Sequence, residues 1–176
     1  PEFDYTADPG TMCFVTGQGT DSTNLEQADV DGGKTSLTTP ALDATGMTDP
    51  VIGCWRWFGS YFPTGTSGGN SGPEPGDYLA VLLSNDNGVS WTPVDTTRGL
   101  ENHWEEQAIH VAAYLTPTAQ VKVRFVATDS PPASWVEAAI DDLTLYDAAI
   151  PAVAVPPRGS GGRLAFRAPW PNPASG

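Results

Sequence analysis

The sequence predicts an all-β fold, a β-sandwich built from short strands. Three observations support this prediction. The 176 residues include 19 glycines and 17 prolines, a composition typical of many short strands and turns and not of a helical bundle. The stretch Gln120–Tyr146 contains one alternating apolar segment and one nearly continuous apolar segment, which are the two patterns that strands show. No long helical period occurs in the chain, and its length suffices for one domain with a substantial core.

The domain is expected to begin with a short strand, Thr11–Thr16, followed by a long polar loop, Gly17–Gly33. At the end of this loop Asp29 and Asp31 stand one residue apart, just before a Gly-Gly turn. This spacing lets both carboxylates face one cation while glycine lets the backbone curl around it. A solvated acidic turn is the alternative interpretation, and the pattern is not that of an EF-hand. Lys34–Pro40 then leads to another short strand.

The next strand, Val51–Phe58, carries two tryptophans. Trp55 and Trp57 share one face of this strand, and Cys54 and Phe58 share the other. Exposed indoles would form a platform for stacking sugars, but a tryptophan on a central strand is more often buried, so a core position is favoured for most of these rings. A second long loop, residues 59–77, follows and begins with Tyr61 and Phe62. Rings in a loop are better candidates for a ligand surface.

Tyr78–Ser84 is an apolar strand that runs into a turn signature. The pattern Ser84-x-Asp86-x-Gly88-x-x-Trp91 matches the Asp-box, a hairpin element. Asp86 is expected to bond turn amides, Gly88 to take a positive φ, and Trp91 to fold back over the hairpin. The element occurs once, so it indicates a turn and not the repeated blades of a propeller.

The last strands carry most of the remaining polar candidates. Trp104–Val111 reads as a strand, with His103 and His110 interpreted as surface residues. Gln120–Tyr146 reads as a hairpin of two strands joined by a Pro-Pro loop, and its second strand contains Asp141 and Asp142. Because neighbours on a strand face opposite ways, one of the two carboxylates is expected to point inward or to lie at a strand end.

The net charge of −13 and a sequence pI of about 4.2 exclude some partners. Such a chain repels nucleic acid and anionic membranes, and it contains no apolar run as long as a transmembrane helix. We therefore expect no nucleic-acid partner and no membrane insertion. The charge suits a secreted or cell-surface protein, and clustered carboxylates suit a hard cation such as Ca²⁺.

Three segments are expected. Residues 1–3, Pro-Glu-Phe, resemble a cloning remnant, and residues 4–147 form the sandwich. Residues 148–176 are rich in proline, glycine and alanine, as in a linker, which would lead to a further C-terminal module. The chain is thus expected to be a piece of a larger exported protein.

Cys13 and Cys54 are the two cysteines. In an exported sandwich a disulfide between them would close a loop of about 40 residues and contribute roughly 3–4 kcal/mol. Two buried free thiols are the alternative, because the sequence does not define the Cα separation that a bridge requires.

Taken in order, several segments resemble the MAM domain and its bacterial jelly-roll relatives, over about Thr11 to Tyr146. The matching pieces are Leu37–Pro40, Cys54–Phe58, Leu79–Val81, Trp91, Trp104, Val121–Phe125 and Glu137–Leu143. This resemblance implies an antiparallel jelly-roll sandwich of two sheets, a non-catalytic role and a structural calcium near the acidic strand. It implies no particular ligand, because relatives differ in partner. Bacterial domains resembling this one occur beside secreted peptidases. The four-cysteine frameworks of the family are incomplete here, since only two cysteines are present.

The leading hypothesis is a calcium-stabilised accessory module of a secreted bacterial multidomain protein, such as a peptidase, that serves adhesion or substrate targeting. Its predicted ligands are Asp29, Asp31 and Asp141, with Glu26, Glu137 and Asp142 as further candidates. The alternative is a carbohydrate-binding module that uses Tyr61, Phe62, Trp57 and Trp135. Its partners would be an extracellular polysaccharide or protein and the neighbouring domains of its own chain. Catalysis by this chain is not expected, because no G-x-S-x-G motif occurs, whereas the parent protein is a candidate hydrolase.

Overall fold

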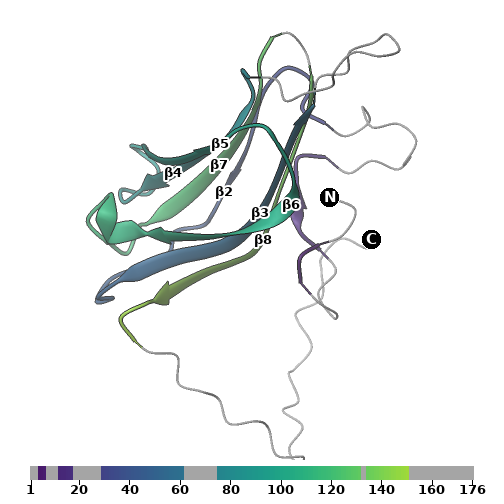
Figure 1. Cartoon of the computed structure of the whole chain (residues 1–176). Coiled ribbons are helices and arrows are strands. Elements are labelled where there is room, and N and C mark those ends of the chain that lie inside the picture. Colours follow the sequence, from purple (N-terminus) through teal and green to yellow (C-terminus); the bar gives the residue numbers. More distant parts are fainter. Residues whose placement is uncertain (1–3, 7–11, 18–28, 62–74, 132–133, 151–176) are drawn as a thin grey trace, which may run out of the picture.

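Two four-stranded sheets face each other in the computed structural model, which describes residues 4–6, 12–17, 29–61, 75–131 and 134–150 (Figure 1). The strands are β1 (Phe14–Val15), β2 (Gly33–Thr38), β3 (Pro50–Tyr61), β4 (Tyr78–Ser84), β5 (Thr92–Thr97), β6 (Leu100–His110), β7 (Lys122–Asp129) and β8 (Trp135–Asp147). A single 3₁₀ turn, η1 (Val111–Ala113), follows β6. No helix in the described ranges is long and apolar enough to cross a membrane.

The strand orders confirm the predicted antiparallel jelly roll. One sheet has the order β1-β8-β3-β6 and the other β2-β7-β4-β5, and the neighbouring strands are antiparallel. Strands adjacent in sequence thus fall in opposite sheets at several points, as in double-sheet jelly rolls. Long central strands, β3 and β8, carry most of the first sheet.

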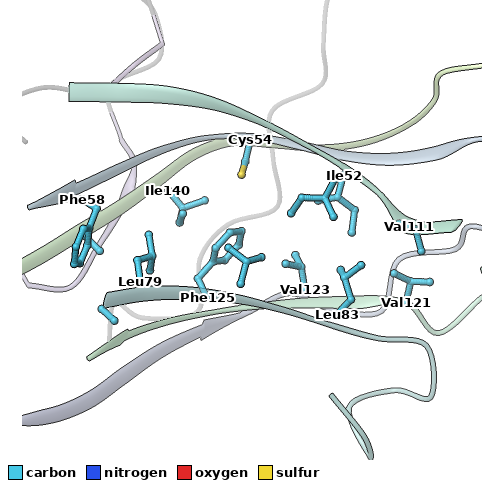
Figure 2. Packing of buried hydrophobic residues seen from close by; sticks show 14 of the residues in the cluster. Ile52, Cys54, Phe58, Leu79, Leu83, Val111, Val121, Val123, Phe125 and Ile140 are labelled. Carbon is cyan, nitrogen blue, oxygen red and sulfur yellow. The ribbon is translucent and has the colours of Figure 1, made fainter. Parts of the chain in front are cut away.

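The hydrophobic core fills the space between the two sheets (Figure 2). Ile52 and Phe58 of β3 are fully buried, as are Leu79 and Leu83 of β4. Phe125 of β7 enters the same cluster. Burying a large apolar side chain contributes about 1.5–3 kcal/mol, so this layer supplies the main driving force that holds the sheets together.

Two strand predictions differ from the structure. The expected hairpin at Gln120–Tyr146 does not form, because β7 pairs with β2 and β4 whereas β8 pairs with β1 and β3. The Pro-Pro segment therefore connects strands of different sheets. The strand β5 was not predicted: its sequence, TPVDTT, is polar and contains Pro93. It is an edge strand, where proline is tolerated because one side of the strand has no partner.

The disulfide alternative is wrong, and the alternative of two buried free thiols holds only for Cys54, because Cys13 is partly exposed. Cys13 and Cys54 are both free. Cys54 points into the core (Figure 2), and burial raises the pKa of its thiol to about 12. Cys13 precedes β1, whose Phe14 pairs with Ile140, so Cys13 lies opposite Asp141. Since Ile140 faces the core, alternation places Cys13 on the outer face and separates it from Cys54.

The predicted Asp-box turn is confirmed. The carboxylate of Asp86 accepts hydrogen bonds from the Ser84 and Ser90 hydroxyls and from the Ser90 amide. These donors hold the pKa of Asp86 well below its usual value. Gly88 has φ of 90°, and the indole Nε1 of Trp91 donates to the Gly88 carbonyl at 3.0 Å. The turn joins β4 to β5 and takes no part in the candidate site below.

Candidate functional site

The candidate site is the outer face of the β1-β8-β3-β6 sheet, the face turned away from the other sheet. On β3 the side chains of Ile52, Cys54 and Phe58 enter the core (Figure 2). Successive side chains on a strand point to opposite faces, so Trp55 and Trp57 lie on the outer face, where both are partly exposed. The expectation that these indoles fill the core is therefore wrong.

Two glycines of β3 make room for rings on this face. A Cβ at Gly59 would lie 2.9 Å from Cη2 of Trp57 and 2.5 Å from Oδ1 of Asn102. A Cβ at Gly53 would lie 3.2 Å from Cε1 of Tyr146. The Trp57 indole and the Tyr146 phenol thus occupy the space that a side chain at either glycine would need. Glycine at these positions lets both rings lie close against the sheet.

Further rings extend the same surface on neighbouring strands. Tyr61 of β3 stacks on Trp135 of β8, with ring centroids 5.2 Å apart and an interplanar angle of 23°. Trp104 of β6 is the cross-strand partner of Trp57. Tyr146 is 46% exposed. We define the aromatic face as Trp55, Trp57, Tyr61, Trp104, Trp135 and Tyr146. Its members come from three adjacent strands, which fixes their relative positions.

Carboxylates flank these rings on the same face. Trp55 pairs across the ladder with Glu106 of β6 and with Asp141 of β8. Glu137 of β8 pairs with Gly59, so a carboxylate also stands beside the indole of Trp57. The surface therefore combines apolar ring faces with hydrogen-bond acceptors, and its fixed charges are negative.

The pair Asp141–Asp142 avoids the core by a β-bulge. Between Gly53 and Trp55 the register with β8 shifts, and Asp142, with φ of 49°, is the extra residue. The expectation that one carboxylate points inward or lies at a strand end is therefore wrong. Asp141 lies on the outer face, where it is 8% exposed, and Asp142 is exposed. The Asp142 amide donates to Oδ1 of Asp141 at 2.8 Å, so the bulge itself satisfies that oxygen.

Asp29 and Asp31 lie at a different place from Asp141. The Val30 amide donates to the Val136 carbonyl at 2.9 Å, which places this segment beside the start of β8. Glu137 and Asp141 are separated by four positions on β8, or about 13 Å along a strand. The structure therefore brings Asp29 and Asp31 near Glu137 but not near Asp141.

Asp29 has an incompletely satisfied carboxylate. Its Oδ1 is buried and has no hydrogen-bond partner among the described residues. Burial raises the pKa of this carboxyl, and the carboxylates of Asp31, Glu137 and Asp129 raise it further. Among the residues that the structure describes, no three His, Cys, Asp or Glu side chains are grouped so as to hold a metal ion. Two of the predicted site residues, Glu26 and Phe62, lie outside the described residues.

Two residues of the aromatic face, Trp104 and Tyr146, escaped the sequence analysis, as did the two glycines of β3. Trp104 and Tyr146 were assigned to strands but given no role. A signal was present in the sequence: Gly53, Trp55, Trp57, Gly59 and Tyr61 occur at alternate positions. From residue 53 to residue 61, one face of the strand therefore carries only rings and glycines. Glycine in a strand interior often marks a close approach by another group.

Comparisons with known proteins define no family for this chain. No family model matches it, and no curated protein matches it. It is similar to a solved structure described as "Family 16 Carbohydrate Binding Module-2", with 18% identity, coverage of 83% of this chain and 82% of that chain, and a TM-score of 0.43. A structure of TmCBM61 in complex with beta-1,4-galactotriose has 14% identity, coverage of 80% and 89%, and a TM-score of 0.40. These likenesses are too remote to bear on function, and the resemblance to the MAM domain stays a prediction.

Proposed function

We propose that this domain is a non-catalytic module that binds a neutral polysaccharide along its aromatic face. The observation that carries the proposal is the row of rings and glycines on β3, where Trp57 lies close against the sheet over Gly59. A sugar ring presents an apolar C–H surface to an aromatic ring and hydroxyl groups at its edge. The aromatic face and its flanking carboxylates offer a partner for each of these features.

The arrangement of the rings favours an extended ligand. Side chains at alternate positions of a strand are about 6.5 Å apart, so Trp55 and Trp57 present successive contacts along β3. Tyr61 continues the row further along the same strand, where it stacks on Trp135. A chain molecule lying along β3 would meet these rings in turn. A single small sugar would contact only part of the row.

The charge of the face narrows the class of polysaccharide. Glu106, Glu137 and Asp141 are register partners of β3 residues on this face, and the chain carries a net charge of −13. Polyuronates and sulfated glycans would be repelled by this field, most strongly at low ionic strength. The carboxylates can instead accept hydrogen bonds from the hydroxyl groups of an uncharged sugar.

Replacing Trp57 by alanine is expected to weaken polysaccharide binding about tenfold or more, because a buried aromatic anchor at a binding surface contributes about 2 kcal/mol. Affinity electrophoresis through gels containing mixed-linkage β-glucan, xyloglucan or galactomannan would measure the loss. Tyr114→Ala is the matched control, since Tyr114 is an exposed ring outside the aromatic face.

A second variant tests whether binding depends on the position of the Trp57 ring as well as on its presence. Gly59→Ala keeps Trp57 but brings a methyl group within 2.9 Å of its indole, so the ring must move, and binding should fall in this variant as well. Wild-type protein retarded by none of the neutral gels, or a Trp57→Ala variant retarded as strongly as wild type, would contradict the proposal.

Calcium binding is a second proposal, favoured by the unpartnered Oδ1 of Asp29. A cation there would give this buried oxygen a partner and offset the repulsion among Asp29, Asp31 and Glu137. These three residues are the ligands we propose from the described part of the chain, together with Glu26 from the sequence. The Asp141–Asp142 pair fits a calcium ion less well, because both oxygens of Asp141 already accept hydrogen bonds from backbone amides.

Calcium is expected to raise the melting temperature by about 5–10 °C at a concentration 100 times its Kd, since binding to the folded state alone then contributes about 2.7 kcal/mol. Differential scanning calorimetry of chelator-stripped protein, with and without millimolar calcium, would measure the shift. Asp29→Asn should remove it, whereas Asp43→Asn, at an exposed turn, should not. Identical melting curves for stripped and calcium-loaded wild type would contradict the calcium proposal and leave the polysaccharide proposal standing.

Both proposals suit an accessory module of a secreted multidomain protein, which would bring a neighbouring domain, such as a peptidase, to an extracellular polymer. The acidic charge and the Pro/Gly/Ala-rich segment after residue 147 support this setting.

A further inference from the structure

We propose a further ligand subsite on the aromatic face, made of Trp55, Asp141 and Asp142, which the chain's own residues Asp4–Thr6 occupy until a ligand displaces them. This inference rests on the proposed polysaccharide function. We call residues 4–6 the N-terminal arm. It lies more than a hundred positions from Asp141 in sequence, yet its ring stacking and its hydrogen bonds to Asp141 and Asp142 all fall on this one patch.

The ring of Tyr5 stacks on Trp55. The ring centroids are 3.5 Å apart and the interplanar angle is 16°, so the two rings are nearly parallel and in close contact. Tyr5 also meets Trp104 edge-on at 6.3 Å. One face of the Trp55 indole is thereby covered by a flat six-membered ring, which is the position and orientation that a stacked sugar ring would take.

The polar groups of the arm bind the two carboxylates beside Trp55. The amides of Tyr5 and Thr6 donate to Oδ2 of Asp141 at 2.9 and 3.2 Å. The Thr6 hydroxyl lies 3.2 Å from that oxygen and donates to Oδ1 of Asp142 at 2.8 Å. A flat ring on Trp55 with donors at its edge toward two carboxylates is what the subsite recognises. A neutral sugar offers the same combination through its C–H face and its hydroxyl groups.

The arm is held in a way that permits displacement. The hydrogen bond to Asp142 is exposed and those to Asp141 are only partly buried, so the hydroxyl groups of a ligand or water can replace the arm as donors to these carboxylates, and Tyr5 remains 41% exposed. Docking also leaves Oδ2 of Asp4 buried without a partner among the described residues. Burying an unpaired carboxylate oxygen opposes docking. A ligand that releases the arm would return Asp4 to water and take over the partners of Tyr5 and Thr6.

Displacement would lengthen the binding surface. Trp55 is two positions from Trp57 on β3, so the subsite adjoins the part of the aromatic face that the arm leaves uncovered. A short oligosaccharide could bind at Trp57 without moving the arm. A longer one would reach Trp55 and compete with it. The arm would thus select for chain length.

The test compares wild type with the double variant Tyr5→Ala/Thr6→Ala. Isothermal titration with a hexasaccharide and a trisaccharide of mixed-linkage β-glucan, xyloglucan and galactomannan is the measurement. We expect the variant to bind the hexasaccharide several-fold more tightly and the trisaccharide equally well. Trp55→Ala in the same background should abolish the gain. Tyr5→Phe, which keeps the stacked ring, should behave as wild type. An affinity that is unchanged or lower in the double variant overturns the inference.

Amide hydrogen exchange of wild-type protein supplies a readout that needs no variant. Saturating hexasaccharide should increase exchange at the Tyr5 and Thr6 amides. If the hexasaccharide binds in the titration while these amides stay protected, the subsite inference fails and the proposed function stands. If no sugar of the panel binds in the titration, both fail.

Discussion

Replacing Arg56 by alanine is expected to lower the free energy of unfolding by about 3 kcal/mol, because removing one partner of a buried ion pair leaves uncompensated charge. Arg56 is 8% exposed and lies between the sheets. Its Nη1 is 2.5 Å from Oδ2 of Asp95 on β5, and its Nη2 is 2.5 Å from Oε2 of Glu105 on β6. Since β5 and β6 are edge strands of different sheets, this one guanidinium joins the two sheets.

The exposure of the carboxylates that bind Arg56 keeps the expected loss of unfolding free energy near the lower end of the range for a broken buried ion pair. The Asp95 and Glu105 side chains are 38% and 39% exposed, so water can solvate them once the guanidinium is gone. Urea unfolding monitored by tryptophan fluorescence would measure the change. Arg56→Lys is the control: it keeps the charge but loses the two-ended fork, so an intermediate loss is expected. A loss below about 1 kcal/mol for the alanine variant would show that the sheets do not depend on this contact.

The sequence predicts the fold class well but not which side of a strand faces the core. Alternation correctly placed Trp55 and Trp57 on one face of β3 and Cys54 and Phe58 on the other. Which face is buried depends on the side on which the second sheet packs, and the sequence of β3 alone does not determine this. The commoner fate of tryptophan favoured the core, whereas Gly53 and Gly59 on the same face indicated rings lying against an outer surface.

The rest of the site could not be predicted, because it depends on which segments distant in sequence the fold brings together. The spacing of Asp29 and Asp31 predicts a cation site in the acidic loop, and the resemblance to the MAM domain implies a calcium near the strand that holds Asp141, so the three residues are predicted to share one ion. Their separation depends on where Val30 pairs along β8, and this register is fixed by the fold and not by local sequence. The Asp141–Asp142 pair was read with a strict period of two, which a β-bulge interrupts. The docking of Tyr5 on Trp55 has no local signal at all, since the two residues are 50 positions apart.

Replacing Asp77 by alanine is expected to lower the free energy of unfolding by about 3 kcal/mol and also to weaken polysaccharide binding. Asp77 is fully buried. Its Oδ2 accepts from the Ser60 and Ser134 hydroxyls at 2.6 and 2.5 Å, and its Oδ1 accepts from the Ser130 amide at 2.9 Å. In the variant the Ser60 hydroxyl and the Ser130 amide lose this acceptor, and the Ser134 hydroxyl keeps only its longer contact with Oδ1 of Asp129 at 3.2 Å. A buried polar group that loses its partner costs about 1–3 kcal/mol.

The expected effect on binding follows from the neighbours of these serines. Ser60 directly precedes Tyr61, and Ser134 directly precedes Trp135, the two rings that stack at one end of the aromatic face. Asp77 therefore anchors the backbone on which that stack is built, although it touches neither ring in the contacts described. Loss of the anchor should let the rings separate, which near-ultraviolet circular dichroism would record as reduced aromatic signal.

Two further variants separate these effects of Asp77. Asp77→Asn keeps the volume and one acceptor oxygen, so its loss of stability should be smaller than that of Asp77→Ala. Asp43→Ala removes an exposed carboxylate that accepts only from a nearby turn, and it should leave both stability and binding unchanged. Urea unfolding and affinity electrophoresis of all three proteins would measure both quantities. If Asp77→Ala lowered stability but bound polysaccharide like wild type, the Tyr61–Trp135 end of the face would not be part of the binding surface, and the ligand would be confined to Trp55 and Trp57.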